Sequence, residues 1–596
     1  MNVTGRPEGV RFGAGGGPVG RRGAKAPAAL PRFRAPAVFG LLLLLFVVLG
    51  GRSVWLQVVD NEFLQEQGSS RHSREIVVPA HRGRIVDRSG EALAISMPVK
   101  SLWTFPGKME ATPEQLKRLA EVLSITPQAL AKRLPADADF AFVGRALSPE
   151  VAERAMALRI KGLYDQNEYR RHYPGGETTS HILGFTGDHD IGQEGLELAQ
   201  QEWLGGKPGS RRVIINRRGD AVEEVAAIRA PQAGRDLALA IDSRLQGLAF
   251  RELKAAIDAN KAKAGGLVIL DAQTGEVLAL ANLPTYDPNA RDSNGRGKLP
   301  REKMRNRALT DTFEPGSTMK PFTIAAALDV GRVRPDTRIE TAPGSLSIGP
   351  NTIRDAHPNG TLTVEQVIQK SSNVGAAKIA LGLPAETMWE YFSDAGFGAP
   401  PRTGFPGEVG GRLRPAKSWK PIEQVTMSYG HGVSVNLVQL ARAYTVFASD
   451  GELKPISLLK GGGPVAGKPV VSPATARAVR RMLELAVLPG GTAPRAQISG
   501  YRVAGKTGTA HKLDAGGYTN KYVSSFVGFA PVSRPRLIVA VMIDDPQAGQ
   551  HYGGAVAAPV FAAVTAAALR MLGVPTDAPV DNVILPPEGS EVREET

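Results

Sequence analysis

Residues 267–280 read Leu-Val-Ile-Leu-Asp-Ala-Gln-Thr-Gly-Glu-Val-Leu-Ala-Leu, two apolar runs separated by a turn that closes at Gly275. Short apolar runs on both sides of a glycine turn predict a β-hairpin. A further strand is predicted just upstream, at 237–241, and a helix from about Ser243 to Lys263 lies between the two. This stretch therefore opens a region that mixes strands and helices.

The far end of the same region supplies more strands. Three strand-like runs occur at 501–509, 521–530 and 537–543, and an Ala-rich helix follows from about Ala555 to Met571. Strands at both ends with helices between them predict one antiparallel sheet flanked by a helical insertion. We assign residues 236–573 to this domain. Residues 574–596 hold Pro, Asp and Glu in excess, which predicts a disordered tail.

A candidate nucleophile lies in the segment Phe313-Glu314-Pro315-Gly316-Ser317-Thr318-Met319-Lys320-Pro321-Phe322. Pro315-Gly316 predicts a turn, and the apolar residues up to Leu328 predict a helix that begins near Ser317. Residues i and i+3 share a helix face, so the Ser317 hydroxyl and the Lys320 amine are expected within hydrogen-bond reach. A desolvated lysine near another cation can serve as the base for a serine, and N–H groups at the helix N-terminus face a developing oxyanion.

S-x-x-K alone is weak evidence, since it recurs at Ser457 to Lys460, which we interpret as surface. Two further elements make the pattern specific. Ser371-Ser372-Asn373 lies downstream of Ser317, and Lys506-Thr507-Gly508-Thr509 falls in a predicted strand. A serine with a lysine, then S-x-N, then K-T-G, in this order, form the signature set of penicillin-interacting serine enzymes.

Other chemistries find little support. The 596 residues contain no cysteine, which excludes a thiolate nucleophile and Cys-ligated metal sites. The nine histidines form no H-E-x-x-H motif, and His357, His431 and His551 are interpreted as structural or groove-lining. Asp544-Asp545 is interpreted as a turn before Pro546. No metal and no cofactor are expected.

Residues 35–51 carry no charge, and the apolar pattern continues to Val59. A run of this length suits one crossing of a bilayer, so we predict an uncleaved transmembrane anchor at 35–59. Residues 1–34 form a basic tail that is predicted to be disordered and, by the positive-inside rule, cytoplasmic. Everything after about residue 60 is then expected outside the cytoplasm. A G-x-G-x-x-G match in the tail, at Gly15 to Gly20, follows no strand and is discounted.

The formal net charge of +14 does not indicate nucleic-acid binding once its distribution is considered. Residues 1–34 hold seven basic side chains against Glu8, a local net charge of +6. That part of the charge fixes topology, and the remainder is spread over a long exported region. No nucleic-acid partner is expected.

With these motifs in place, the sequence resembles the class B penicillin-binding proteins, the high-molecular-mass D,D-transpeptidases of bacterial cell-wall synthesis. Within them it is most similar to the division-specific subgroup, the penicillin-binding protein 3 type. The resemblance runs from about residue 35 to 573. The other segments that carry it are Arg82–Arg88 with Leu93-Ala94, Gly184–Gly187, Gly195–Glu197, Met304–Arg307, Tyr429–Gly432, Asp545–Gly549 and Tyr552–Gly554.

The resemblance implies an α+β multidomain fold. It comprises a single N-terminal transmembrane helix, an elongated mixed α/β pedestal or dimerisation-like module at 60–235, and a transpeptidase domain at 236–573. The last would be serine β-lactamase-like, an antiparallel sheet flanked by helices. Two departures from the family pattern stand out: Gly505 precedes the K-T-G lysine, where a branched apolar residue is expected, and His551 precedes Tyr552.

The resemblance also implies the chemistry. Ser317 would attack the D-Ala-D-Ala carbonyl of a stem pentapeptide, Lys320 would take its proton, and Ser371 would pass a proton to the leaving amine. Lys506 would add positive potential. The implied substrate-binding residues are Asn373, Thr507, Gly508 and Thr509, and the backbone N–H groups of Ser317 and Thr509 would form the oxyanion hole. An amine from a neighbouring strand would then complete the cross-link, and β-lactams would acylate the same serine.

The expected partners are peptidoglycan stem peptides, β-lactams, the membrane and divisome proteins, including a glycan-polymerising membrane protein. The expected location is the inner (plasma) membrane, with the catalytic domain in the periplasm. Alternatives are an elongation-type class B transpeptidase, a D,D-carboxypeptidase, a β-lactamase, a β-lactam sensor, or a division scaffold with little catalysis. The anchor and the additional module disfavour a β-lactamase, and the short tail offers a sensor no signalling region.

Overall fold

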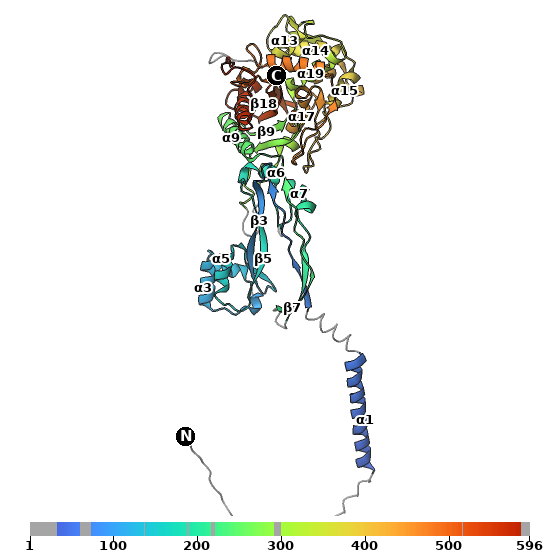
Figure 1. The fold of residues 1–596 in the computed structure, drawn as a ribbon, viewed down its shortest axis with the longest axis vertical. Coiled ribbons are helices and arrows are strands. Elements are labelled where there is room, and N and C mark those ends of the chain that lie inside the picture. Colours follow the sequence, from blue (N-terminus) through green and yellow to red (C-terminus); the bar gives the residue numbers. More distant parts are fainter. Residues whose placement is uncertain are drawn as a thin grey trace, which may run out of the picture. The chain divides into compact units, whose positions relative to one another are not determined.

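The computed structural model describes residues 33–59, 73–135, 137–187, 190–215, 221–290, 300–514 and 517–585 (Figure 1). The chain divides into two compact units, one of residues 1–76 with 211–228 and one of residues 77–210 with 229–596. Most of the predicted basic tail, with its glycine motif, and the last eleven residues lie outside the described residues.

The first unit contains the predicted anchor. Helix α1 spans Arg34–Val54 and continues into the π-helical turn η1, Trp55–Val59. Residues Pro36–Val58 are long and apolar enough to cross a membrane, and none of this span is buried within the protein. This confirms the predicted apolar helix. The unit also holds most of a three-stranded sheet in the order β1-β6-β7, with β1 Ser73–Val78, β6 Gly209–Ile215 and β7 Ala221–Arg229.

The second unit begins with the pedestal, a sheet covered by helices on one face. The strand order is β4-β3-β2-β8, and β5 also pairs with β3. Apolar side chains such as Leu102 and Val143 pack against Leu119 and Leu130 from the covering helices. The elements are β2 Ile85–Val86, β3 Ala92–Thr104, α3 Pro113–Val122, α4 Pro127–Arg133, β4 Ala141–Leu147, α5 Pro149–Met156, β5 Leu163–His172 and β8 Leu237–Ala238.

These three pedestal helices start where the sequence contains start signals. Thr112, Thr126 and Ser148 each accept a hydrogen bond from the third helical N–H, and a proline follows each of them at the first helical position. Such caps satisfy backbone donors that the helix leaves unpaired, and the proline loses no hydrogen bond there. Local sequence therefore fixes how each helix enters the layer over the sheet.

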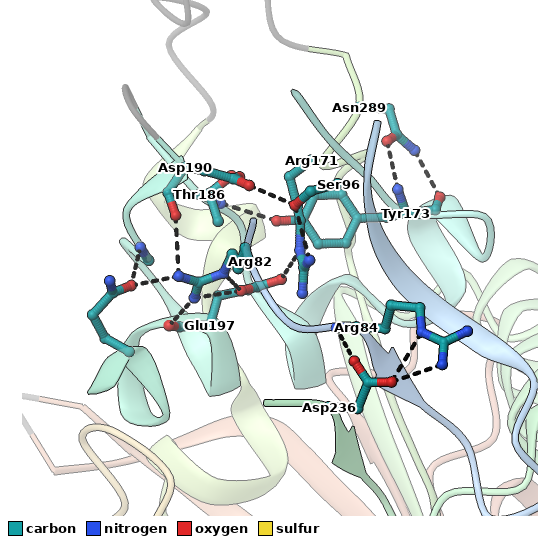
Figure 2. A network of polar contacts seen from close by, with 12 residues as sticks. Arg82, Arg84, Ser96, Arg171, Tyr173, Thr186, Asp190, Glu197, Asp236 and Asn289 are labelled. Carbon is teal, nitrogen blue, oxygen red and sulfur yellow. Dashed lines mark hydrogen bonds and ion pairs between the residues drawn. The ribbon is translucent and has the colours of Figure 1, made fainter. Parts of the chain in front are cut away.

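A buried ion network joins two segments that carry the family resemblance. Glu197, in α7 Gly195–Ala199, lies between Arg82 and Arg171 (Figure 2). Arg82 Nε donates to one carboxylate oxygen at 2.7 Å, and Arg171 Nε donates to the other at 2.7 Å. The exposed fractions of these side chains are 1% or less. The Arg82 and Glu197 motifs, 115 residues apart in the chain, thus meet in the pedestal core.

The large sheet of the second unit has the order β10-β9-β19-β18-β17, with every pair antiparallel. Two strands come from the start of the domain and three from its end, which confirms the predicted antiparallel sheet with a helical insertion. The strands are β9 Ala264–Asp271, β10 Val277–Leu283, β17 Ala504–Asp514, β18 Gly517–Ala530 and β19 Leu537–Asp544.

Both faces of this sheet are buried along β9, β10 and β19, which explains why these three strands read as continuous apolar runs. Leu267 and Ile269 face one core, formed with α9 Ser243–Ala259 and α21 Ala558–Met571. Val268 and Leu270 face the other core, formed with the helical insertion. In Figure 1, helices α13, α14, α15 and α19 lie on the opposite side of the sheet from α9.

The insertion consists of short helices and small hairpins. Its main helices are α11 Arg307–Thr310, α12 Lys320–Asp329, α13 Val364–Lys370, α14 Asn373–Leu381, α15 Ala385–Asp394, α16 Pro421–Ser428, α17 Leu437–Ala443, α18 Thr445–Ala448 and α19 Pro473–Leu485. Its strand pairs are β11 Arg338–Glu340 with β14 Thr361–Thr363, β12 Ser345–Ile348 with β13 Asn351–Arg354, and β15 Glu452–Leu453 with β16 Lys468–Pro469.

Two predicted elements differ from the structure. The strand predicted at 237–241 is only β8, and it pairs in parallel with β2 of the pedestal rather than with the large sheet. Residues 574–585, predicted to be disordered, are held against the domain. Gln497 exchanges two hydrogen bonds with the backbone of Ile584, and the Asn582 amide donates to Ile498 O and Tyr501 O. Composition misses this because the partners of the segment are the Gln497 side chain and backbone groups of a distant loop.

Candidate active site

The candidate nucleophile lies in a short 3₁₀ turn, η5 Gly316–Met319, that runs directly into α12. Ser317 and Lys320 therefore sit one helical turn apart, as the sequence predicts. Lys320 Nζ donates to Ser317 Oγ at 2.9 Å. Ser317 is 5% exposed and Lys320 is fully buried. A serine hydroxyl and an amine are thus paired in a site that largely excludes water.

The S-x-N segment brings a second hydroxyl to the same amine. Ser371 ends α13 in the left-handed region, with φ of 62°, and Asn373 begins α14. Lys320 Nζ donates to Ser371 Oγ at 3.1 Å and also to the Ser371 carbonyl oxygen. A non-glycine residue with this backbone conformation is uncommon and indicates that the surrounding structure imposes it. The amine consequently lies between the two serine hydroxyls.

Asp355 supports this turn and was not singled out from the sequence. Its carboxylate accepts from Ser372 Oγ at 2.6 Å and from Val374 N–H at 2.8 Å. Ser372 in turn caps α14 by accepting from Gly375 N–H. Asp355 follows β13 in a small hairpin, so only the tertiary fold reveals that it fixes the segment around Ser371.

The K-T-G segment lies on β17, an edge strand of the large sheet. Gly508 has no room for a side chain, because a Cβ there would lie 2.6 Å from Pro315 O and 2.5 Å from Ser525 Oγ. The glycine thus lets the strand approach the turn before Ser317 closely. Lys506 Nζ donates to Thr507 Oγ1 at 3.2 Å, and Gly553 N–H donates to Thr509 Oγ1 at 3.0 Å.

The fold therefore brings the three motifs to one place. Ser317, Lys320 and Ser371 are joined by hydrogen bonds, β17 packs against the nucleophile turn, and Asn373 starts the helix that follows Ser371. Asn373 itself donates from Nδ2 to Arg354 O at 3.3 Å. A buried amine is more easily kept neutral than an exposed one, so this arrangement suits acyl transfer to a serine.

Aromatic side chains border the site. The Tyr429 ring centroid is 6.0 Å from Lys320 Nζ, and His431 packs between Tyr429 and Tyr518. Burial is the main cause that lowers the pKa of His431 to about 4, so its ring is neutral at neutral pH. Burial also raises the pKa of Glu314, whose carboxylate accepts from Gly432 N–H and from the Tyr518 hydroxyl.

The residues discounted from the sequence remain outside the site. Ser457 donates to Leu459 O, and Lys460 is exposed, so the second S-x-x-K forms no comparable pair. Asp545 occupies a left-handed turn with φ of 56°, and Asp544 pairs with Lys512. Within the residues that the structure describes, no group of three His, Cys, Asp or Glu side chains could hold a metal ion.

The two departures noted in the sequence have local explanations. A Cβ on Gly505 would lie 2.5 Å from Phe526 Cζ, so the glycine makes room for an aromatic ring of the neighbouring strand. The His551 ring stacks on Tyr522 with centroids 4.0 Å apart and an interplanar angle of 18°. It therefore belongs to a ring cluster that also includes Tyr552 and His511.

Two protein-family models match the chain. The model described as the penicillin binding protein transpeptidase domain matches residues 265–566. The model described as the penicillin-binding protein dimerisation domain matches residues 77–239. The first covers the large sheet with all three motifs, and the second covers the pedestal.

Similar proteins extend over almost the whole chain. The probable peptidoglycan D,D-transpeptidase PenA of Neisseria gonorrhoeae is 42% identical over 92% of this chain and 94% of its own. The peptidoglycan D,D-transpeptidase FtsI of Escherichia coli K12 is 41% identical over 92% of this chain and 93% of its own. A solved transpeptidase domain of Burkholderia pseudomallei penicillin-binding protein 3 is 50% identical, with a TM-score of 0.53, over 57% of this chain and 98% of that chain.

Proposed function

Because the chain belongs to the class B penicillin-binding proteins and is a membrane-anchored peptidoglycan D,D-transpeptidase, we propose that Ser317 is its nucleophile and that it works at the division septum. The observation that carries the choice of nucleophile is the 2.9 Å hydrogen bond from Lys320 Nζ to Ser317 Oγ. The neighbouring Ser371 hydroxyl, 3.1 Å from the same amine, offers a path for a second proton.

In the acylation step, the neutral Lys320 amine takes the proton of Ser317 as Oγ attacks the carbonyl carbon of the penultimate D-Ala. The negative charge that develops on the carbonyl oxygen is held by the backbone N–H groups of Ser317 and Thr509. The carbon–nitrogen bond to the terminal D-Ala then breaks, and the leaving amine receives a proton through Ser371. The products are an ester on Ser317 and free D-Ala.

Substrate recognition falls to β17 and to the start of α14. Thr507 and Thr509 bind the terminal carboxylate, Gly508 lets the substrate-binding strand pack closely against the turn before Ser317, and Asn373 holds the stem-peptide amide. Lys506 supplies positive potential near the carboxylate. The Asn373, Lys506, Thr507 and Thr509 side chains are buried, and Gly508 and Thr509 lie against the nucleophile turn, which supports these roles.

In the second step, an amine of a neighbouring stem peptide attacks the ester carbonyl, a new amide bond forms, and Ser317 regains its proton. A D,D-carboxypeptidase would instead admit water and release a tetrapeptide. Mass analysis of products from stem-peptide donor and acceptor separates the two. We expect cross-linked dimer, and tetrapeptide alone would contradict the transpeptidase assignment of this site.

A septal role is supported by the similarity to FtsI over 92% of this chain, and by the division-type segments at 304–307, 429–432 and 545–549. Depletion of the protein in growing cells is expected to give filaments that fail to divide. Round cells would indicate side-wall synthesis and contradict the proposal.

The orientation proposed for the anchor places the basic tail in the cytoplasm and the catalytic region in the periplasm. The chain contains no cysteine, so a single introduced thiol has no background. Lys117→Cys, at an exposed position of α3, should react in intact cells with a reagent that does not cross the inner membrane. Ala24→Cys, in the tail, should react only after lysis, and the reverse pattern would overturn the orientation.

We also place a glycan-polymerising membrane protein and other divisome proteins among the partners of this chain. The pedestal supports this, because it matches a dimerisation-domain model and contains none of the three catalytic motifs. Co-purification from detergent-solubilised membranes tests it. A polymerase that co-purifies with the full chain but not after deletion of residues 77–235 is expected, and equal recovery would contradict a pedestal contact.

A further inference from the structure

The turn Gly490-Gly491-Thr492 lies outside the three motifs, yet it contacts Thr507 of the K-T-G motif and Lys370, the residue just before the S-x-N motif. Lys370, the last residue of α13 before Ser371, donates from Nζ to Gly490 O at 2.9 Å. Thr492 Oγ1 lies 3.2 Å from Thr507 Oγ1 on β17. The turn therefore contacts both the C-terminal end of α13, just before the S-x-N motif, and β17, which carries the K-T-G motif.

The backbone of this turn allows Thr492 little freedom. Gly490 has φ of +81°, a conformation that side chains other than glycine rarely adopt. A Cβ on Gly491 would lie 2.3 Å from Ala486 O, so the turn packs directly on the chain that follows α19. Thr492 itself is only 5% exposed. Its hydroxyl is thus held in one place by the surrounding structure.

The contact between Thr492 and Thr507 affects which hydrogen bonds the Thr507 hydroxyl can make. A hydroxyl has one proton to donate and two lone pairs to accept with. Thr507 Oγ1 accepts from Lys506 Nζ at 3.2 Å, since an ammonium only donates. If Thr492 donates as well, both acceptor positions of Thr507 are occupied. Its single proton must then point away from both neighbours and toward whatever lies in the site.

We propose that Thr492 is a positioning residue that makes Thr507 a hydrogen-bond donor to the carboxylate of the substrate. Thr492 does not touch the substrate, and it sets specificity through the orientation of one hydroxyl. The inference rests on the proposed function in one respect, because it takes Thr507 to face the terminal carboxylate. It adds a residue that none of the three motifs contains.

The test compares two thioester donors with the full-length protein in detergent. Both are acyl-D-alanine thioesters, one with a carboxylate on the leaving group and the other with a carboxamide at the same position. Thr492→Val keeps the shape of the side chain and removes the hydroxyl. It is expected to lower kcat/KM for the carboxylate donor about five- to tenfold, mainly by raising KM. The value of kcat/KM for the carboxamide donor should change less than twofold. Thr492→Ser, which keeps a hydroxyl at this position, should retain most of the preference for the carboxylate donor over the carboxamide donor.

A control variant separates positioning from stability. Thr341 is fully buried and donates to Gly360 O, away from the motifs. Thr341→Val is expected to lower the free energy of unfolding without changing the ratio of the kcat/KM values for the two donors. An equal loss of kcat/KM for both donors in Thr492→Val, or no loss for either, would overturn the proposal. A Thr492→Ser variant that behaves like Thr492→Val would overturn it as well.

The failure of this proposal is distinguishable from failure of the proposed function. Wild-type protein that is not acylated by a penicillin would contradict the function itself. Wild-type protein that is acylated and prefers the carboxylate donor, with a Thr492→Val variant that keeps the same preference, would contradict only the role of Thr492.

Discussion

Lys320→Met is expected to reduce the rate of acylation by a penicillin about 10²–10⁴-fold, the usual contribution of a positioned general base. The reason is geometric, since Lys320 Nζ is hydrogen-bonded to the Ser317 hydroxyl and the site is buried. Methionine has a side chain of similar length to lysine and places no unpaired polar group in the buried position, so the variant should remain folded. The measurement is the second-order rate of labelling with a fluorescent penicillin, alongside thermal unfolding.

The chain provides a matched control for this substitution. Lys460 belongs to the second S-x-x-K, but its side chain is exposed, and Ser457 Oγ donates to Leu459 O instead. Lys460→Met should therefore label at the wild-type rate. If Lys320→Met also labels at the wild-type rate, a group other than Lys320 activates the serine and the assignment of the base is wrong.

Glu197→Gln is expected to destabilise the pedestal by about 3–5 kcal/mol, the usual cost of leaving buried charge without its partner. Glutamine has nearly the same shape, so the change removes the negative charge and little else. Arg82 and Arg171, each 1% exposed, would then share a buried site without the carboxylate that both contact (Figure 2). Urea unfolding followed by tryptophan fluorescence, which includes Trp103 on β3, measures the loss.

The neighbouring pair Arg84–Asp236 is the control, because both side chains are about half exposed. Asp236→Asn should lower the free energy of unfolding far less than Glu197→Gln, since water solvates and screens an exposed pair. Equal effects of the two substitutions would mean that burial of the Glu197 network does not determine its contribution.

What the sequence predicts well is what depends on local spacing. Ser317 and Lys320 are three residues apart, so a single helical turn suffices to bring them together. The hairpin at 267–280 and the strands near the end of the chain follow from short apolar runs, and their pairing into one antiparallel sheet follows from the run of helices between them. The order of the motifs identifies Ser371 and Lys506 through resemblance, and the structure adds the contacts of Ser371.

What the sequence does not predict depends on contacts made by the tertiary fold. Asp355 reaches Ser372 across 17 residues, and Thr492 reaches Thr507 across 15, without any periodicity to indicate either contact. Arg171 falls in a basic cluster in the sequence, yet the fold buries it on Glu197. The segment 574–585 has the composition of a tail but finds hydrogen-bond partners in the loop at 497–502. In each case the deciding partner is distant in the chain.

The most direct test of the central claim is the intact mass of the full-length protein after incubation with a penicillin, followed by peptide mapping. A β-lactam ring opens without losing a fragment, so the mass of the wild-type protein is expected to rise by one whole drug molecule, located on Ser317. Ser317→Ala, with unchanged thermal unfolding, should gain no mass. A wild-type protein that gains no mass, or an adduct that persists in Ser317→Ala, would contradict Ser317 as the nucleophile.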